Sequence, residues 1–125
     1  MTVSIDLAKL ARDKGFDEIC NFGYCYDKEK QGYYTNYDPG YFKNSILWEK
    51  HYAAPSREQL QVWLQKQGVF VIVDIDQTLE PKFVYKINKH LGDGNWDKLG
   101  SNWSDLFYRY EQALEEGLTE ALNKL

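Results

Sequence analysis

The sequence predicts an α+β fold, in which a small antiparallel sheet of two to four strands is packed on one face by two or three helices. Two observations lead to this class. Apolar residues recur at helical spacing through residues 110–125, and side chains alternate between two faces in residues 69–76 and 83–90. Such alternation favours an antiparallel hairpin with one covered face. The second half should therefore run helix, strand, strand, a possible third strand and helix.

The length of 125 residues is typical of one domain. We predict a single domain over residues 1–125, with a helix and a tyrosine-rich segment in residues 1–45 and an α+β core in residues 46–125. The apolar fraction of 43% is near the globular average, which argues against disorder.

The first half contains one predicted helix, over residues 4–14, because a serine can cap its start and a glycine can end it. Residues 20–45 hold six tyrosines among glycines and predict short strands or an irregular loop. Within them, Tyr-Asp-Pro-Gly at 37–40 is a turn signal. Residues 46–48 predict another short strand.

The second helix is expected to open at Ser56, since Ser56-x-x-Gln59 matches a capping box, and to end at Gly68. The two alternating segments then form the hairpin, joined by a loop over residues 77–82 that contains Pro81.

A loop is expected over residues 92–105, because they are rich in Gly, Asn, Asp and Ser. Residues 106–108 can add an edge strand. The closing helix spans roughly residues 110–124, and the position of Gly117 within its apolar stripe indicates a close approach to the sheet.

The composition limits the kinds of partner that the chain is expected to bind. The net charge is -4 and Lys and Arg form no block, which disfavours nucleic acid, because phosphate neutralisation supplies most of that affinity. No apolar run reaches the roughly 18 residues of a membrane span, and residues 1–20 are amphipathic rather than a signal peptide. We expect a cytoplasmic protein that does not enter a membrane. Cys20 and Cys25 are expected to be reduced thiols, with no metal and no cofactor.

Residues 70–79, FVIVDIDQTL, look like the nucleophile strand of haloacid-dehalogenase-type phosphatases, with Asp74 as nucleophile and Asp76 as acid/base. LGDGNWD at 91–97 looks like the acidic metal motif of that family. There the two motifs end different parallel strands, and a parallel crossover needs at least about 10 to 12 residues. Because residues 83–90 already predict a hairpin strand, we interpret the motifs as coincidental and assign no catalytic residue.

The tyrosine-rich segment is the best candidate for a binding surface. Tyr and Trp are enriched at interface hot spots, because they bury much area and keep a polar tip. The same rings can stack single-stranded bases, or they can line a half-buried small sheet. The candidate partner-binding residues, called the tyrosine set below, are Tyr24, Tyr26, Tyr33, Tyr34, Tyr37, Tyr41 and Trp48.

Two segments resemble a group of small uncharacterised proteins encoded by prophages and mobile elements of Bacteroides-type bacteria. YAAPSREQLQVWLQKQGVFVIV at 52–73 is similar to a helix-then-strand segment of that group, and YEQALEEGLTEALNKL at 110–125 is similar to its closing helix. DLAKLARDKGF near the N-terminus is similar too. Arg109 departs from the group, which tends to have a Ser or Thr cap there. The group has no assigned activity, and it implies a bacterial cytoplasm as the setting.

We therefore expect a non-enzymatic accessory protein of a phage or mobile element. It would bind a host or phage protein through its aromatic surface, as an anti-defence or regulatory factor. The first alternative is a nucleic-acid-binding module, because the helix-strand-strand-strand-helix order resembles that of double-stranded-RNA-binding domains. The second alternative is a magnesium-dependent phosphatase-like enzyme.

Overall fold

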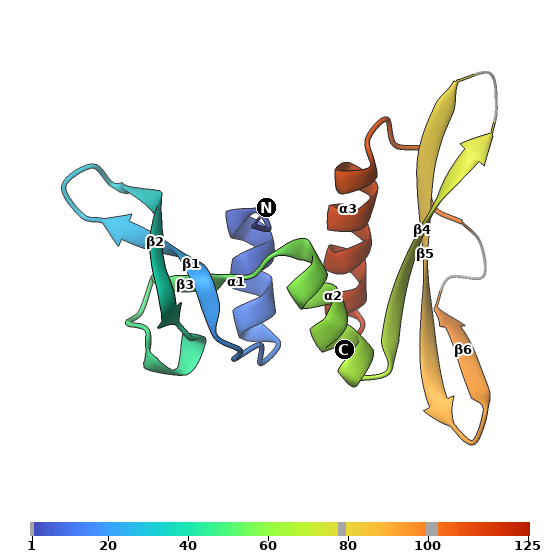
Figure 1. Ribbon diagram of the computed structural model, residues 1–125, viewed down its shortest axis with the longest axis horizontal. Helices are drawn as coiled ribbons and strands as arrows, with labels where there is room; N and C mark the ends of the chain where they lie inside the picture. Colours follow the sequence, from blue (N-terminus) through green and yellow to red (C-terminus); the bar gives the residue numbers. More distant parts are fainter. Residues whose placement is uncertain (1, 78–79, 100–102) are drawn as a thin grey trace. The chain divides into compact units, whose positions relative to one another are not determined.

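The computed structural model describes residues 2–77, 80–99 and 103–125 (Figure 1). Within these ranges the chain forms three α-helices and two antiparallel sheets, which confirms the predicted α+β class. In chain order the elements are α1 (Ile5–Asp13), β1 (Cys20–Asp27), β2 (Gly32–Phe42), the short 3-10 helix η1 (Asn44–Ile46), β3 (Tyr52–Ala54), α2 (Arg57–Lys66), β4 (Val69–Gln77), β5 (Pro81–Gly92), β6 (Asn95–Leu99) and α3 (Tyr110–Asn123).

The chain divides into two compact units, residues 1–59 and residues 60–125, and the division falls inside α2. Unit 1 holds the sheet with strand order β2-β1-β3, and unit 2 holds the sheet with strand order β4-β5-β6. The single domain over residues 1–125 stays a prediction.

The tyrosine-rich segment of unit 1 is a regular hairpin. β1 and β2 pair antiparallel from Asp27 opposite Gly32 to Phe22 opposite Tyr37. The Asp27 carboxylate accepts the backbone N–H groups of the two residues that follow Lys28, which stabilises the turn. The segment is therefore strand rather than irregular loop, and its two strands, of 8 and 11 residues, are longer than predicted.

Two local predictions in unit 1 are wrong. Residues 37–40 do not turn the chain back. They lie inside β2, at a point where its pairing with β1 shifts register. Cys20 pairs with Phe42 and Phe22 pairs with Tyr37, so one residue of β1 lies opposite four residues of β2. The turn-forming residues make an irregularity in the strand. Residues 46–48 are not a strand either, since η1 ends at Ile46 and β3 begins later.

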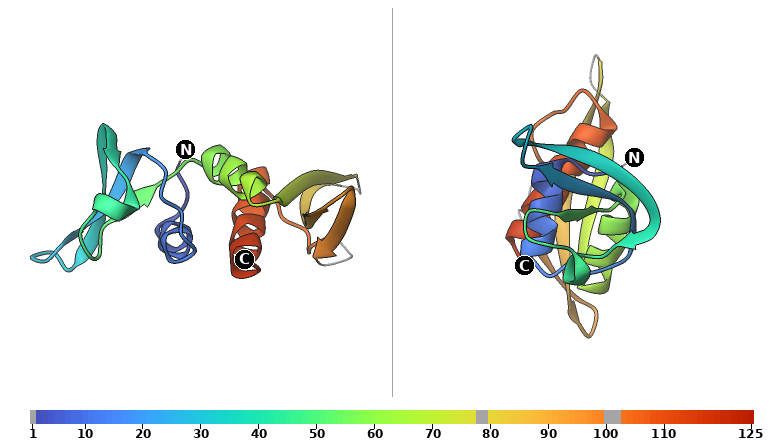
Figure 2. Two further views of the ribbon diagram at one scale, coloured as in Figure 1. Left: turned by 90° about the horizontal axis from the view of Figure 1, so that it is seen from below. Right: turned by 90° about the vertical axis from the view of Figure 1, so that its left-hand side faces the viewer.

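α1 lies on one side of the unit 1 sheet (Figure 2, left). Ser4 caps α1 by accepting the N–H of Leu7, and Gly15 follows the helix with a φ of 96°, as its predicted role requires. Phe42 lies directly over Gly23, where an added Cβ would meet the Phe42 ring at 2.1 Å. A side chain at position 23 would displace that ring.

The predicted hairpin of unit 2 is confirmed. β4 and β5 pair antiparallel from Val69 opposite Lys89 to Gln77 opposite Pro81, so the connection is shorter than predicted. α3 covers one face of this sheet (Figure 2, left). Gly117 lies at the contact, and an added Cβ would be 2.6 Å from Cγ1 of Val71. The expected close approach at Gly117 is therefore confirmed.

Residues 92–105 are not the continuous loop that their composition predicts. Asp93 and Gly94 turn the chain with φ angles of 51° and 75°, and β6 then returns along β5. An Asp-Gly pair with two positive φ angles is the preferred two-residue hairpin turn. Further on, Phe107 pairs with Phe83, so the predicted edge strand at 106–108 is confirmed as a single bridge.

The helix predictions agree with the structure to within one or two residues at each end. Ser56 accepts the N–H of Gln59, as the capping box requires. The Gln59 side chain, however, donates to the carbonyl oxygen of Ile19, so it connects α2 to the start of β1. Arg109, which precedes α3, makes no side-chain capping hydrogen bond. In the part of the chain that the structure describes, every helix is too short or too polar to traverse a bilayer.

Candidate functional site

The structure divides the tyrosine set into two groups, both in unit 1. Three members lie half-buried on β1 and β2, namely Tyr24, Tyr26 and Tyr33. The other four are exposed, with exposed fractions of 52% for Tyr34, 60% for Tyr37, 66% for Tyr41 and 82% for Trp48. Although the residues of the tyrosine set are close in sequence, they therefore do not form one continuous aromatic surface.

The half-buried group lies on the face of the sheet that α1 covers. The hydroxyl of Tyr24 donates to the carbonyl oxygen of Val3 at 2.6 Å. Tyr26 and Tyr33 are cross-strand partners whose ring centroids are 5.2 Å apart, and Tyr52 of β3 lies 6.1 Å from Tyr33. Burial is the main cause that raises the pKa of Tyr33, and the neighbouring Tyr52 adds to it. Tyr52 belongs to this cluster although the sequence offered no reason to include it.

Three cations surround these rings. The Nζ atom of Lys9 lies 4.8 Å from the centroid of Tyr33, the Nζ atom of Lys50 lies 4.9 Å from that of Tyr26, and the Arg12 guanidinium lies 5.4 Å from that of Tyr52. These distances are within the range of cation–π attraction. The basic tyrosine cluster is defined as Tyr26, Tyr33 and Tyr52 together with Lys9, Arg12 and Lys50.

Trp48 lies on residues 43–51, called the Trp48 loop below, whose backbone is held at several points. The buried Asn44 side chain donates to the carbonyl oxygen of Phe16 at 2.8 Å and accepts the N–H of Ala53 at 2.9 Å. Arg12 donates to the carbonyl oxygen of His51 at 2.5 Å. The loop backbone is thus fixed by side chains from within the loop and from α1.

A further contact fixes the first part of the Trp48 loop. Asp17 accepts the N–H of Ser45 at 2.6 Å, and this hydrogen bond is the main cause that lowers the pKa of the Asp17 carboxyl. Despite these restraints, the Trp48 side chain and the Ile46 side chain, which is 65% exposed, remain in solvent. The structure therefore presents large apolar side chains on a loop whose backbone is hydrogen-bonded at several points.

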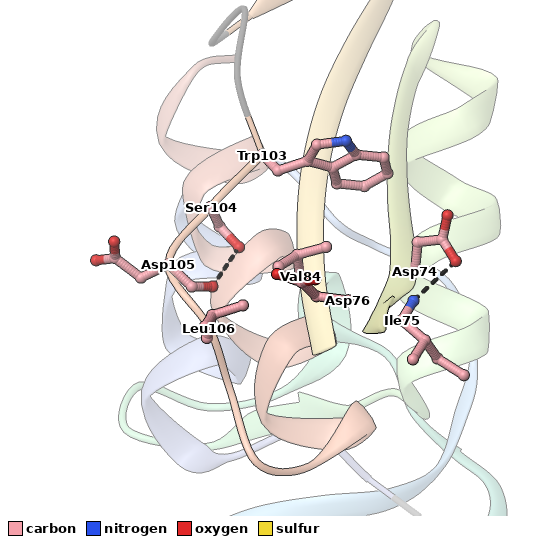
Figure 3. Close-up of a pocket in the computed structure, with 8 residues that line it drawn as sticks. All are labelled: Asp74, Ile75, Asp76, Val84, Trp103, Ser104, Asp105 and Leu106. Atoms are coloured by element: carbon pink, nitrogen blue, oxygen red, sulfur yellow. Dashed lines mark hydrogen bonds between the residues drawn. The ribbon is translucent and has the colours of Figure 1, made fainter. Parts of the chain in front are cut away.

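Unit 2 contains an open depression of about 750 Å³ that includes Asp74 and Asp76 (Figure 3). The Trp103 indole reaches across β5 toward β4, while the Asp105 carboxylate points away from the depression (Figure 3). The Asp74 carboxylate accepts the N–H of Ile75, the residue next to it, at 2.7 Å. The carboxylates around the depression thus point in different directions.

The contact between Asp74 and Ile75 has a structural explanation. β4 is an edge strand, and alternate residues of such a strand direct their N–H and C=O groups away from the sheet. Gln61 of α2 donates to the carbonyl oxygen of Val71 at 2.9 Å. Covering edge groups in this way keeps an apolar edge from pairing with another chain. Asp74 and Gln61 therefore protect the edge of the sheet.

The two acidic motifs lie at opposite ends of the β4–β5 hairpin. Asp74 pairs with Val84 and Asp76 with Lys82, whereas Asp93 lies in the turn beyond the other end of β5. At about 3.3 Å per residue, Val84 and Asp93 are roughly 30 Å apart. The arrangement implied by the phosphatase-like motifs is therefore not formed. Among residues 2–77, 80–99 and 103–125, no three His, Cys, Asp or Glu side chains are grouped so as to hold a metal ion.

Both cysteines are free and buried in unit 1. Burial is the main cause that raises the pKa of the Cys20 thiol to about 12, and the nearby Glu18 charge contributes. A thiol with so high a pKa is a poor nucleophile at neutral pH, because the reactive species is the thiolate.

No family model matches this chain, and neither the curated proteins nor the solved structures provide a match. The resemblance to prophage proteins therefore stays a prediction. Lys9, Arg12 and Asn44 were not among the predicted site residues, and their contacts join residues up to 39 positions apart. No local pattern could have indicated them.

Proposed function

We propose that this chain is a non-enzymatic protein-binding module that uses Trp48 as its anchor. The observation that carries this proposal is the combination of an 82% exposed tryptophan with a loop backbone held by Asn44, Arg12 and Asp17. A flexible loop could hide an indole against its own surface. This loop is held so that the indole stays in solvent.

The energetics support an anchoring role. Burying roughly 200 Å² of aromatic surface against a partner contributes about 5 kcal/mol at 25 cal/mol per Å². Part of this free energy is usually lost in ordering the binding loop. Since the Trp48 loop is already ordered by its hydrogen bonds, that loss is reduced. Tryptophan side chains of this kind are typical interface hot spots.

The biological setting follows from the resemblance to proteins of prophages and mobile elements. On that basis the chain is an accessory protein that acts in the cytoplasm of a bacterium, as an anti-defence or regulatory factor. Its partner is a host or phage protein. Tyr34, Tyr37 and Tyr41 of the tyrosine set are further exposed aromatic residues of unit 1.

Affinity capture with two variants tests the anchor. The wild-type chain, Trp48→Ala and Tyr108→Ala are immobilised and exposed to lysate of a Bacteroides-type bacterium, and retained proteins are identified by mass spectrometry. Tyr108 is the matched control, because it is an exposed aromatic residue of unit 2. The retained protein is then purified and titrated against all three chains by calorimetry.

A saturable complex with the wild type and with Tyr108→Ala, weakened about 30-fold or more by Trp48→Ala, is the expected result. Equal affinity of Trp48→Ala and the wild type for the purified partner would contradict the anchoring role. Circular dichroism spectra of both variants check that each chain is folded.

Nucleic-acid binding is the alternative, and the order of elements in unit 2 favours it. The order α2-β4-β5-β6-α3 is the one that resembles double-stranded-RNA-binding domains. The first turn of α3, however, carries Glu111, and one cation, Arg109, precedes it. A labelled RNA duplex that binds the chain with a steep salt dependence would favour this alternative over the protein-binding module.

A further inference from the structure

The basic tyrosine cluster brings three cations together over a group of tyrosine rings. The ammonium groups of Lys9 and Lys50 lie over tyrosine rings, and the Arg12 guanidinium lies over a tyrosine ring and donates to backbone carbonyl oxygens. Their positive groups lie over tyrosine rings, which attract a cation through the ring quadrupole but leave its net charge in place. The cluster is therefore a local positive region on a chain whose net charge is -4.

The rings also restrict where these cations lie. Lys9 is within 4.8 Å of the Tyr33 centroid and 5.8 Å of the Tyr52 centroid, so one ammonium group contacts two rings. Ordered side chains lose less entropy on binding than free ones. The cluster is thus prepared for an anionic group.

Arg12 connects the basic tyrosine cluster to the Trp48 loop in unit 1. Its guanidinium lies over Tyr52 and also donates to the carbonyl oxygen of His51. Lys50 is itself part of the loop and lies two residues from Trp48. A partner that buries the Trp48 indole therefore brings its neighbouring side chains close to these cations.

We propose that the partner presents an acidic segment, whose Asp and Glu carboxylates pair with Lys9 and Lys50 beside the pocket that receives Trp48. This inference rests on the proposed protein-binding function and adds the chemical class of the partner. Opposite charge at the rim of an interface mainly raises the association rate and excludes wrong partners.

Protein is favoured over nucleic acid as the source of the negative groups. The cations already occupy faces of the tyrosine rings, and base stacking would require those faces. Three cations also neutralise few phosphates, whereas nucleic-acid binders commonly contact about 6 to 10 of them. An acidic peptide needs fewer charges, because Trp48 supplies apolar contact.

A synthetic poly-glutamate peptide labelled with fluorescein is the probe, and fluorescence anisotropy measures its binding to the full chain. The test variant is the double substitution Lys9→Gln and Lys50→Gln, which keeps much of each aliphatic stem and removes two charges. The control is Lys28→Gln with Lys30→Gln, which removes two charges from the exposed turn between β1 and β2. Oligothymidylate of the same length is the competing probe.

Poly-glutamate should bind the wild type and the control pair alike, and the test variant about tenfold more weakly. Binding should disappear at about 0.5 M salt, where charges are screened over a few ångströms. Equal weakening by the two double variants would overturn the proposal, since it would reflect net charge alone. Tighter binding of oligothymidylate than of poly-glutamate would overturn it in favour of nucleic acid.

The result is separable from the test of the anchor. Poly-glutamate has no apolar side chain, so Trp48→Ala should leave its affinity unchanged while it abolishes capture of the partner. Capture that depends on Trp48 without any poly-glutamate binding overturns the acidic segment and leaves the anchor intact. The opposite outcome is also informative. If poly-glutamate binding depends on Lys9 and Lys50 but capture of a partner does not depend on Trp48, the basic site is supported and the anchoring role of Trp48 is contradicted.

Discussion

Replacement of Gly117 by alanine tests how closely α3 approaches the sheet of unit 2. In an isolated helix this change stabilises by about 1 kcal/mol, because glycine is the poorer helix former. In unit 2 the added Cβ would lie 2.6 Å from Cγ1 of Val71 and 3.1 Å from Cγ of Tyr85. Carbon atoms prefer separations of about 3.5 to 4.0 Å, so α3 or its neighbours must move by about 1 Å.

The neighbours of Gly117 have little freedom to move. Val71 is buried, and its branched side chain has restricted rotamers. The Tyr85 ring stacks on Phe107, and burial, with the neighbouring Glu120 carboxylate adding to it, raises the Tyr85 pKa. Overpacking such a site costs about 1–3 kcal/mol. Taking about 3 kcal/mol and subtracting the gain in helix propensity, we expect a net destabilisation of about 2 kcal/mol.

Urea unfolding followed by circular dichroism measures this loss. With a denaturant slope of about 2 kcal/mol per M, the midpoint should fall by about 1 M. Val71→Ala removes the atom in closest contact, so the double variant should recover about 1 kcal/mol relative to additive behaviour. A midpoint for Gly117→Ala above that of the wild type would refute the close approach, because helix propensity alone would then decide the outcome.

Three further outcomes are expected in unit 1. Asn44→Ala leaves two buried backbone groups without their partner, so the free energy of unfolding should fall by about 2–4 kcal/mol; an unchanged urea midpoint would contradict this. The pKa of the Asp17 carboxyl is lowered in the folded chain, so this residue stabilises the fold above the pKa that it has in the unfolded chain, about 3.9. This stabilisation is lost as the pH falls through the pKa of the folded chain. The stability difference between wild type and Asp17→Asn, followed by thermal melts across pH, should therefore be constant near neutrality and shrink below about pH 4. Because Cys20 is buried with a pKa raised to about 12, its alkylation by iodoacetamide should be much slower in the folded chain than in urea, and equal rates would argue against this environment.

Local sequence signals identified the elements that depend on near neighbours. The apolar stripe of residues 110–125 located α3, and the alternation in residues 69–76 located β4, because these periods are set by backbone geometry. The Asp93-Gly94 pair also carried a local hairpin signal, but the polar composition around it indicated a loop and β6 was missed. In the same way, the turn residues at 37–40 were absorbed into β2, since pairing with β1 outweighs their local preference.

The sequence by itself determined the α+β class, the hairpin that separates the two acidic motifs, and the aromatic character of unit 1. Only the tertiary structure decided which tyrosines lie beneath α1, that Asp74 accepts the N–H of an edge residue, and that Arg12 and Asn44 fix the Trp48 loop. The physical reason is the range of the interactions. Helices and turns form from contacts within a few residues, whereas the binding surface depends on contacts between distant segments that exist only once both are packed.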